Sequence, residues 1–373
     1  MKVSLFVHEL SGNPIVRAYP IAKAIEYLGH EVEVLGLTYN TDKIYEPYKN
    51  EFEYKTVRSY YDIRWVIINS RKLSKLATGD MVYAFKALWD SYFPALLYSR
   101  FGFKRRLLMD AEDNELWDAF IGNGFKDIFK SKYYPINPVY NKMLHPATLF
   151  ARRKTVACTQ LQKRYGGEIV LHGPDFEKFN PALFANKLTL RKKYNLPEDA
   201  KILVFAGKPV YYNGLPFVSE ALSKGNENWH LVLAGDPNHP IFLQAKETLG
   251  GRCHLLGYIP INDMPEILKL ADVAPIIQTP IPTTKMQMPA KLLEAMCMAK
   301  GIIVSNVGDL PQLINSERGW VIPYNDPIGF NNILSDISDQ PKMLEDKGNA
   351  AREYFIQNAS VQEIAERIRP YFE

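Results

Sequence analysis

The stretch KVSLFVHELSGNPIVRAYPIAKAIEYLGHEVEVL, residues 2–35, decides the fold class. Its apolar start predicts a buried strand over Lys2–Val7, and Ser11-Gly12-Asn13-Pro14 marks a turn. Apolar residues then recur at helical spacing, at Ile15, Ala18, Ala22, Ile25 and Leu28. Gly29 supplies the left-handed residue that ends such a helix, and Glu31–Leu35 predicts the next strand. A right-handed crossover through the helix makes the two strands of this unit parallel.

The same alternation of short apolar runs and helical patterns continues along the chain. In the first half, further strands are predicted at Met81–Phe85, Leu107–Met109, Thr155–Cys158 and Ile169–Leu171. After a polar stretch from Gly173 to Ala200, strands are predicted at Ile202–Ala206, His230–Ala234, His254–Leu256, Val273–Ile277 and Ile302–Ser305. Helices are predicted at Leu215–Leu222 and Pro289–Met298. Two successive α/β patterns of this length predict two doubly wound domains.

The length of 373 residues also favours two domains. We place an N-terminal Rossmann-like domain at residues 1–175, a C-terminal one at residues 176–358, and a terminal helix at residues 359–373. The sequence leaves open which domain this helix packs on, the N-terminal domain being one option. Because ligands bind beyond the carboxyl ends of parallel strands, two such domains facing each other across a cleft suit a reaction that joins two substrates. A hinge is expected near Gly173.

Composition places the chain among ordinary globular proteins, with 47% hydrophobic and 23% charged residues. No run of 18 apolar residues occurs, so we expect no spanning helix. His8 and Glu9 interrupt the N-terminus before a signal-peptide core could form, so we expect no secretion. The three cysteines are odd in number and far apart, which indicates reduced thiols in a cytoplasmic protein.

Positive charge is unevenly spread along the chain. Residues 1–180 hold 26 Lys and Arg against 20 Asp and Glu, a net charge of +6. The rest of the chain has a net charge of −2, which gives the total of +4. Between Lys55 and Arg106 eleven basic residues stand against three acidic ones, with aromatic residues interleaved. This pattern suits an anionic partner, such as a membrane surface, a phosphorylated lipid or nucleic acid. A solvated face over an ordinary aromatic core remains the alternative.

Several common motifs are absent, and their absence narrows the chemistry. No G-x-G-x-x-G follows the first strand, and no G-x-x-x-x-G-K-[ST], H-E-x-x-H or G-x-S-x-G occurs. No D-x-D pair is present to hold a divalent ion on a diphosphate. If the chain binds a nucleotide diphosphate, we therefore expect protein groups rather than a metal to meet its charge.

The most informative stretch is KMQMPAKLLEAM, residues 285–296. Pro289 suits the first turn of a helix, and the free amides there form an anion site. Glu294 lies in a segment otherwise made for burial, and a buried carboxylate needs donors that a ribose diol would supply. The alternative is a surface glutamate paired with Lys291 at i,i+3 spacing.

This stretch resembles the nucleotide-sugar motif of family 4 glycosyltransferases, the large retaining family with the GT-B fold. The resemblance runs through most of the C-terminal half, in segments similar to the family's at residues 202–208, 213–215, 231–236, 256–260 and 299–311. The N-terminal half matches more loosely, through Ser11-Gly12-Asn13, Arg17 and the segment Gly29–Val32. Residues 171–175 and 179–181 resemble the family's hinge signature.

The resemblance implies a donor site and roles for its residues. The donor-binding residues would be Gly12, Gly207, Lys208, Asn213, Gly235, Tyr258, Ile259, Lys285, Met286, Gln287, Met288, Pro289, Ala290, Lys291 and Glu294. Within this set, Glu294 would hold the ribose and Tyr258-Ile259 would carry the base. Asp110 and Lys208 would be catalytic, Lys208 by offsetting charge on the leaving diphosphate. Arg17 and Asp113 would lie on the acceptor side, with an acidic helix cap as the alternative for residues 110–113.

Two positions depart from the family pattern. The family often has two glutamates spaced E-x7-E, and Met286 stands where the first would be. The family also commonly has a lysine five residues after its basic loop residue, where this chain has Asn213. Both departures concern the donor, the first its sugar hydroxyls and the second its diphosphate.

The predicted function is therefore that of a retaining hexosyltransferase. It would move a hexose from a nucleotide-diphosphate sugar, such as UDP-glucose, to a saccharide or lipid-linked saccharide in surface polysaccharide synthesis. It would need no cofactor and no metal, and would contact the inner membrane face peripherally. The alternatives are a nucleotide-sugar epimerase or hydrolase of the same fold, or a non-catalytic nucleotide-sugar binding subunit. No nucleic-acid motif accompanies the basic half, so no nucleic-acid partner is expected.

Overall fold

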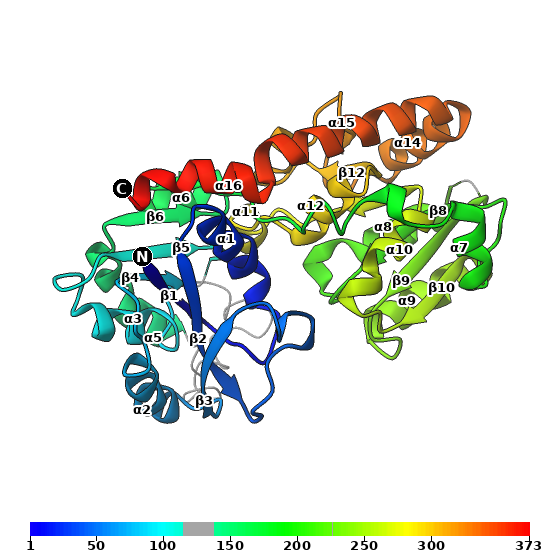
Figure 1. Cartoon of the computed structure of the whole chain (residues 1–373). Helices are drawn as coiled ribbons and strands as arrows, with labels where there is room; N and C mark the ends of the chain where they lie inside the picture. Colours follow the sequence, from blue (N-terminus) through cyan, green and yellow to red (C-terminus); the bar gives the residue numbers. More distant parts are fainter. Residues whose placement is uncertain (115–137, 226) are drawn as a thin grey trace. The chain divides into compact units, whose positions relative to one another are not determined.

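The computed structural model describes residues 1–114, 138–225 and 227–373. The chain divides into two compact units. The first unit contains Met1–His172 together with Val361–Glu373, and the second contains Gly173–Ser360. Each unit is built on its own parallel sheet with helices around it (Figure 1). The terminal helix therefore belongs to the first unit.

Within the described residues, the first unit has a seven-stranded sheet in the order β3-β2-β1-β4-β5-β6-β7. Its strands are β1 (Lys2–Val7), β2 (Glu31–Tyr39), β3 (Glu53–Ser59), β4 (Met81–Phe85), β5 (Leu107–Ala111), β6 (Arg153–Val156) and β7 (Glu168–Ile169). All neighbours pair in parallel, with Leu5 of β1 between Val34 and Tyr83. The strand order reverses between β1 and β4, which makes the carboxyl ends of these two strands the switch point of the first sheet.

Three helices of the first unit, α1 to α3, lie among the strands of the first hundred residues. Its helices are α1 (Ile15–Tyr27), α2 (Ile63–Ser74), α3 (Tyr92–Ser99), α5 (Pro138–Leu144), α6 (Thr159–Tyr165) and α16 (Val361–Ile368). The sequence did not predict β3, α2 or α3. In β3 only Ser59 is buried, and charged residues occupy an edge strand that lacks an apolar run. The α2 helix begins at Asp62, whose side chain accepts a hydrogen bond from the Arg64 amide.

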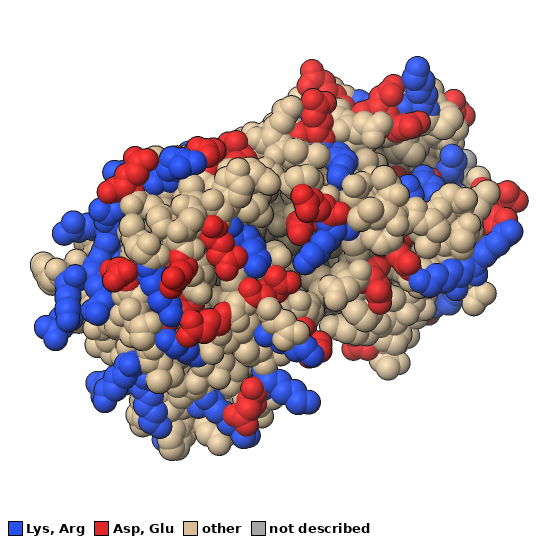
Figure 2. Space-filling view, in the orientation of Figure 1, with Lys and Arg blue, Asp and Glu red and all other residues tan. Residues whose placement is uncertain are grey.

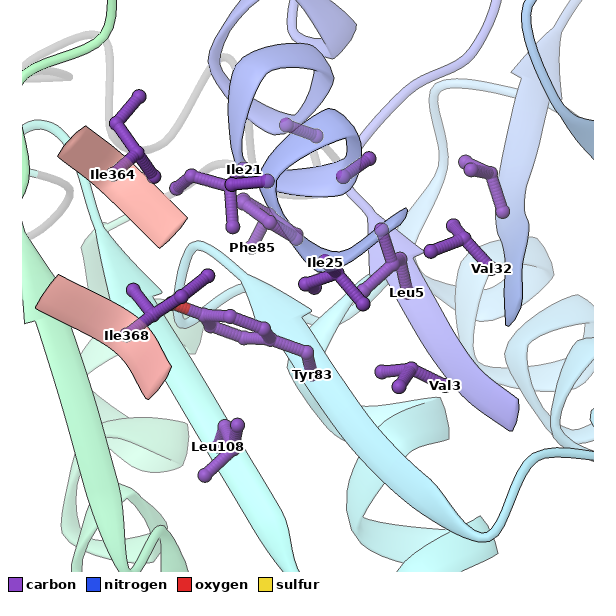
Figure 3. Packing of buried hydrophobic residues seen from close by; sticks show 14 of the residues in the cluster. Val3, Leu5, Ile21, Ile25, Val32, Tyr83, Phe85, Leu108, Ile364 and Ile368 are labelled. Atoms are coloured by element: carbon purple, nitrogen blue, oxygen red, sulfur yellow. The ribbon is translucent and has the colours of Figure 1, made fainter. Parts of the chain in front are cut away.

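The core of the first unit joins residues from both ends of the chain. Val3 and Leu5 of β1 pack with Ile21 and Ile25 of α1 and with Tyr83 of β4 (Figure 3). The terminal segment adds further members to the same cluster, namely Ile364, Ala365, Ile368, Tyr371 and Phe372. Ile364 and Ile368 are fully buried, which explains why apolar residues recur at helical spacing in this segment. The last turn of the chain is thus part of the N-terminal core.

The second unit has a six-stranded parallel sheet within the described residues, in the order β10-β9-β8-β11-β12-β13. Its strands are β8 (Lys201–Ala206), β9 (Trp229–Ala234), β10 (Cys253–Gly257), β11 (Val273–Ile276), β12 (Gly301–Ser305) and β13 (Trp320–Ile322). Its helices are α7 (Lys187–Lys193), α8 (Leu215–Ser223), α9 (Pro240–Leu249), α10 (Met264–Leu270), α11 (Pro282–Lys285), α12 (Ala290–Cys297), α13 (Leu310–Leu313), α14 (Pro327–Asp339) and α15 (Pro341–Ala359). Here the order reverses between β8 and β11.

The predicted strands of both halves are present with bounds shifted by at most a few residues. One local prediction is wrong: Pro289 is not in the first turn but precedes α12 in an extended conformation, and the helix starts at Ala290. No helix in the described part of the chain combines the length and apolar character needed to cross a bilayer.

We predict that Ile364→Ala lowers the free energy of unfolding of the first unit by about 2–5 kcal/mol, because it leaves a cavity in a closed core. The matched control is Gln362→Ala on the exposed face of the same helix, which should change stability by less than about 0.5 kcal/mol. Urea unfolding followed by circular dichroism measures both. Equal effects of the two substitutions would show that the terminal helix does not contribute to the core.

Candidate functional site

The switch point of the second sheet lies where β8 and β11 end. Gly207 and Lys208 follow β8, and Gln278 and Thr279 follow β11. The Thr279 amide donates to the Tyr212 carbonyl over 2.9 Å, so the segments after the two strands are joined. Ligands of open parallel sheets bind at such points, and the predicted Lys208 lies at this one.

Three neighbouring strands present their following loops together. The Gly207 amide donates to the Ala234 carbonyl at 3.0 Å, and the Gly235 amide donates to the Gly257 carbonyl at 2.8 Å. Gly235 has a φ of +154°, and a Cβ there would come within 3.0 Å of the Gly207 carbonyl oxygen. Glycine is therefore required at Gly235 by both conformation and space. The predicted Ile259 is half-buried in the loop after β10.

Two side chains on these loops are open to solvent. Lys208 is exposed, and no described residue forms an ion pair with it. Tyr258 is 74% exposed. An exposed aromatic ring and an unpaired ammonium group beside glycine loops suit a flat base and a phosphate respectively.

The α12 helix brings its first turn over β8. The Nζ atom of Lys291 lies 4.2 Å from the centre of the Phe205 ring, the last residue but one of β8. Burial lowers the pKa of Lys291 to about 8, and Glu294 opposes this shift. The amides of Ala290 and Lys291 open the helix and have no intrahelical partner. An anion between Lys208 and this turn would therefore meet positive charge from both.

Glu294 is half-buried on α12 and has no partner. Its carboxylate forms no hydrogen bond and no ion pair within 4.0 Å with any described residue, Lys291 included. Burial raises the pKa of Glu294 to about 7, with Lys291 acting in the opposite direction. The alternative of a surface ion pair with Lys291 is thus not formed. A partly desolvated carboxylate that lacks donors is suited to receive them from a ligand.

The segment before α12 contributes a polar pair that the sequence did not single out. Gln278 is fully buried after β11, and its Nε2 atom lies 3.4 Å from Oε1 of Gln287. The backbone amide of Gln278 donates to Ser305 Oγ at 2.8 Å. The side-chain Oε1 of Gln278 has no hydrogen-bond partner among the described residues. A buried amide oxygen without a donor at the switch point marks Gln278 as a further candidate. The signal in the sequence that could have identified Gln278 is a polar residue directly after the predicted strand Val273–Ile277.

The remaining predicted donor residues lie around this pair. Lys285 is exposed, Met286 is half-buried and Met288 is buried. Asn213 is half-buried at the end of a 3₁₀ turn, Tyr211–Asn213, that leads into α8. The next residue, Gly214, has a φ of +69° and lies directly against Ile277, where a Cβ would collide. Asn213 is therefore held next to the loop that follows β11.

In the first unit, two predicted site residues form a buried ion pair. Arg17 is 1% exposed and donates to both oxygens of Asp110, from Nε at 2.9 Å and from Nη2 at 2.7 Å. Arg17 Nη1 also donates to the Val170 carbonyl and to His172 Nδ1. Thr155 donates to Asp110 from the neighbouring strand. Arg17 and Asp110 are therefore held in a buried ion pair that stabilises the first unit. The catalytic role of Asp110 and the acceptor-side position of Arg17 stay predictions.

Asp113 is also engaged in an ion pair. Lys86 Nζ lies 2.6 Å from Asp113 and 3.2 Å from Glu112. Burial raises the pKa of Glu112, and Lys86 opposes this shift. Gly12, predicted on the donor side, is half-buried in the first unit beside Glu9. Among the residues that the structure describes, no group of three or more His, Cys, Asp or Glu side chains could hold a metal ion.

Comparison with solved structures identifies the fold. HepE of Anabaena, solved in complex with UDP, superposes with a TM-score of 0.74 at 15% identity, covering 100% of this chain and 99% of HepE. Further structures of HepE contain UDP and glucose or UDP-glucose. The chain therefore has the GT-B fold of glycosyltransferases, with two Rossmann-like units.

The sequence of the second unit is similar to that of known glycosyltransferases. Residues 186–354, which lie in the second unit, match the model of the family described as glycosyl transferases group 1. An uncharacterized glycosyltransferase of Methanocaldococcus jannaschii is 29% identical over 183 residues, which cover 46% of this chain and 43% of that protein. The D-inositol 3-phosphate glycosyltransferase of Xylanimonas cellulosilytica is 24% identical over 205 residues, 52% of this chain and 47% of that enzyme.

A third relative is TuaC of Bacillus subtilis, a glycosyltransferase named for teichuronic acid biosynthesis. It is 26% identical over 137 residues, which cover 36% of this chain and 32% of TuaC. The matched segments span less than half the length of each of these three relatives.

We predict that Arg17→Leu lowers the free energy of unfolding of the first unit by about 3–5 kcal/mol, because Asp110 is left buried without its cation. The double variant Arg17→Leu/Asp110→Leu should recover part of this loss, since neither charge then stays unpaired. The exposed pair of Arg58 with Asp42 supplies the control, and Arg58→Ala should cost under about 1 kcal/mol. Urea titration of the four proteins measures the differences, and a single variant no less stable than the control would contradict the structural role.

Proposed function

We propose that the chain is a retaining hexosyltransferase that uses a uridine diphosphate sugar. The observation that carries this proposal is Glu294, a partly buried carboxylate without donors inside a group 1 glycosyltransferase domain. A ribose diol supplies two hydroxyl donors, and hydrogen bonds to a charged acceptor are worth about 1.5–3 kcal/mol each. HepE, which shares the fold, is the protein solved with UDP-glucose.

The donor chemistry follows from the charges at the second switch point. As the bond between the anomeric carbon and the diphosphate lengthens, negative charge develops on the leaving oxygen. Lys208, Lys291 and the first-turn amides of α12 would stabilise that charge. We propose that these groups act without a divalent metal, because the sequence contains no D-x-D pair. The acceptor attacks on the leaving-group face, which needs no protein nucleophile.

The sugar and the acceptor are assigned by class. We propose a saccharide or lipid-linked saccharide acceptor in surface polysaccharide synthesis, supported by the relative TuaC. Gln287 directly follows Met286, where many family members have a glutamate for the sugar hydroxyls, and Gln278 Nε2 lies 3.4 Å from Gln287 Oε1. Their amides can donate to and accept from a neutral hexose hydroxyl without a charge. A sugar epimerase or donor hydrolase would use the same donor site, and product analysis separates these reactions from transfer.

A membrane surface is the proposed partner of the first unit. The solvent face of α2 and the turn after it carries Trp65, Ile68 and Leu76, which are 46%, 44% and 41% exposed. Three exposed cations share this face, Arg71, Lys72 and Lys75. Blue side chains gather over α2 at the lower left of Figure 2. Aromatic and apolar side chains between cations suit an anionic membrane surface.

The turn after α3 contributes less than the sequence indicated. Phe103 is 84% exposed, but the Arg105 guanidinium lies 4.1 Å over the Tyr98 ring and donates to the Gly79 carbonyl. Arg106 donates to the Tyr371 carbonyl. Arg105 and Arg106 therefore stabilise the fold through contacts with other parts of the first unit. We assign the membrane contact chiefly to α2.

We predict that UDP binding tightens about fivefold between pH 6 and pH 8, because ionisation of Glu294 strengthens it about tenfold and deprotonation of Lys291, whose pKa is about 8, weakens it about twofold. The free Glu294 carboxyl has a pKa of about 7, and the ribose hydroxyls donate to its ionised form, so binding releases a proton and is weaker below pH 7. Glu294→Gln should weaken UDP binding by about 1.5–3 kcal/mol and should flatten the pH dependence. Isothermal titration calorimetry in buffers of different ionisation enthalpy measures affinity and proton release together.

The control for this titration is Glu317→Gln, an exposed carboxylate in the same unit. It should leave both affinity and pH dependence unchanged. Unaltered UDP affinity in Glu294→Gln would remove Glu294 from the donor site. Repeating the titration in EDTA tests the metal-independent donor site, which would be wrong if chelation abolished binding.

We predict that the protein floats with anionic vesicles at low salt and not with neutral ones. Replacing Arg71 and Lys72 by glutamate should abolish flotation, since each basic residue contributes about 1 kcal/mol on an anionic leaflet. Charge reversal of Lys224 and Lys342, exposed in the second unit, is the matched control and should leave flotation intact. Equal recovery with neutral and anionic vesicles would refute an electrostatic membrane contact.

A further inference from the structure

A pair of histidines connects the edge strand of the second sheet to its neighbour. β10 lies at one end of the sheet, beside β9 (Figure 1). His230 belongs to β9 and His254 belongs to β10. The Nδ1 atom of His230 lies 2.9 Å from the Nε2 atom of His254, and the two ring planes differ by 13°. This distance is that of an N–H···N hydrogen bond, so the two side chains join the strands in addition to the backbone ladder.

The histidine pair lies on the face of the sheet opposite the core cluster of the second unit. His254 stands opposite Val232 in the strand register, and residues two apart in a strand share a face, so His254 is on the same face as His230. Both imidazoles are half-buried. The core cluster takes the alternate residues of the two strands, namely Trp229, Leu231, Leu233, Cys253 and Leu255. The hydrogen bond therefore adds a polar contact between β9 and β10 on the face opposite this cluster.

The strand that this pair holds ends in a loop of the candidate donor site. The register of β10 against β9 shifts between Leu255 and Gly257, and the Gly257 carbonyl then accepts a hydrogen bond from the Gly235 amide. Tyr258, whose exposed ring suits a base, follows directly and is four residues from His254. An edge strand is bonded to its sheet on one side only, so the position of this loop depends on contacts between β10 and β9.

The number of protons on the pair determines whether this hydrogen bond exists. When both imidazoles are neutral, one of the two facing nitrogens carries a proton and the other accepts it. A single added proton leaves that bond in place, because it binds the far nitrogen of the donor ring. A second added proton occupies the accepting nitrogen, so the bond is lost and two positive charges repel each other.

The charged groups around the pair oppose its protonation. Burial lowers the pKa of His230, and Arg252 in the 3₁₀ turn Gly250–Arg252 lowers it further. Burial also lowers the pKa of His254, with His230 and Lys246 of α9 acting in the same direction. No described acidic residue forms an ion pair with either ring. Since both charged neighbours are cations, the neutral pair is favoured at pH 7.

We propose that the hydrogen bond between His230 and His254 is an acid-sensitive latch for β10 and the loop that follows it. An unfolded histidine has a pKa of about 6.5, and a histidine whose pKa is lower in the folded chain stabilises that chain less as the pH falls. The latch is therefore closed at pH 7 and opens as both rings become protonated below about pH 6. Its effect on the donor rests on the proposed function, because release of the loop with Tyr258 should weaken UDP binding in acid.

Hydrogen exchange of the full chain without any ligand tests the latch directly. After correction for the intrinsic exchange rate, amides of residues 253–259 should exchange at least about fivefold faster at pH 5 than at pH 7, because local opening exposes them. Amides of the central strand β8 should keep the same protection at both pH values. Mass spectrometry of peptic fragments gives both measurements in one experiment.

Two substitutions of His254 separate the latch from general acid sensitivity. His254→Gln keeps an amide that can bond to His230 and removes one titrating ring, so the acid-induced exchange should be lost. His254→Leu removes the bond at every pH, so the segment should already exchange rapidly at pH 7. The matched control is His239→Asn, which replaces another half-buried histidine of this unit with a residue that also caps α9, and the acid-induced exchange should remain.

The regulatory effect on the donor is measured by UDP titration at pH 6 and pH 5. The loss of affinity between these pH values should be at least about twofold smaller in His254→Gln than in the natural protein. Glu294 is present in both proteins, so its own titration cancels in the comparison. An equal loss in the two proteins overturns the regulatory effect.

The outcomes separate failure of the latch from failure of the proposed function. Equal corrected exchange of residues 253–259 at pH 5 and pH 7 in the natural protein overturns the latch. An acid-induced increase that persists in His254→Gln overturns it as well. A natural protein that shows the acid-induced exchange but binds no UDP at any pH keeps the latch and overturns the proposed function.

Discussion

Parallel strand pairing is the constraint on which both candidate sites depend. Because all strands of a sheet run in one direction, the loops that follow them gather at one edge. The order in each sheet reverses once, between β1 and β4 in the first unit and between β8 and β11 in the second. At these two places adjacent strands send their connections to opposite faces, and polar groups can remain without covering structure. His8, Asp90, Lys208 and Gln278 all lie in the segments that follow these strands.

Charge pairing distinguishes structural from functional groups at these edges. Arg17 and Asp110 satisfy one another through two short hydrogen bonds and are almost fully buried. A buried ion pair of this kind fixes the position of α1 on β5, although both charges are desolvated. Glu294 and Lys208 have no such partner among the described residues. Burial without hydrogen-bond donors destabilises the Glu294 carboxylate. A diol that supplies these donors removes this cost on binding, and its affinity is higher for that reason.

The features that the sequence predicted correctly depend on residues close together in the chain, and those that it missed depend mostly on residues far apart in the chain. The run Lys2–Val7 shows a buried strand by itself, and the neighbours of Glu294 within one helical turn show that its carboxylate is half-buried. The edge strand β3 was missed because only Ser59 in it is buried and charged residues interrupt it, so it has no apolar run. The Arg17–Asp110 pair joins positions 93 residues apart, so no local pattern could show that Asp110 was already occupied. Asp90, 82 residues from His8, escaped notice for the same reason.

The two switch points also divide the chemistry of group transfer in a consistent way. The second unit offers cations and helix amides near an unpaired carboxylate, which suits a phosphorylated, hydroxyl-rich donor. The first unit has used its cations at this edge in ion pairs, with Arg17 on Asp110 and Lys86 on Asp113. The other polar groups at this edge are His8 with Asp90 and two stacked tyrosines, Tyr39 and Tyr61, a neutral to acidic environment that does not favour a diphosphate. Electrostatics therefore favours an anionic ligand at the second switch point over the first.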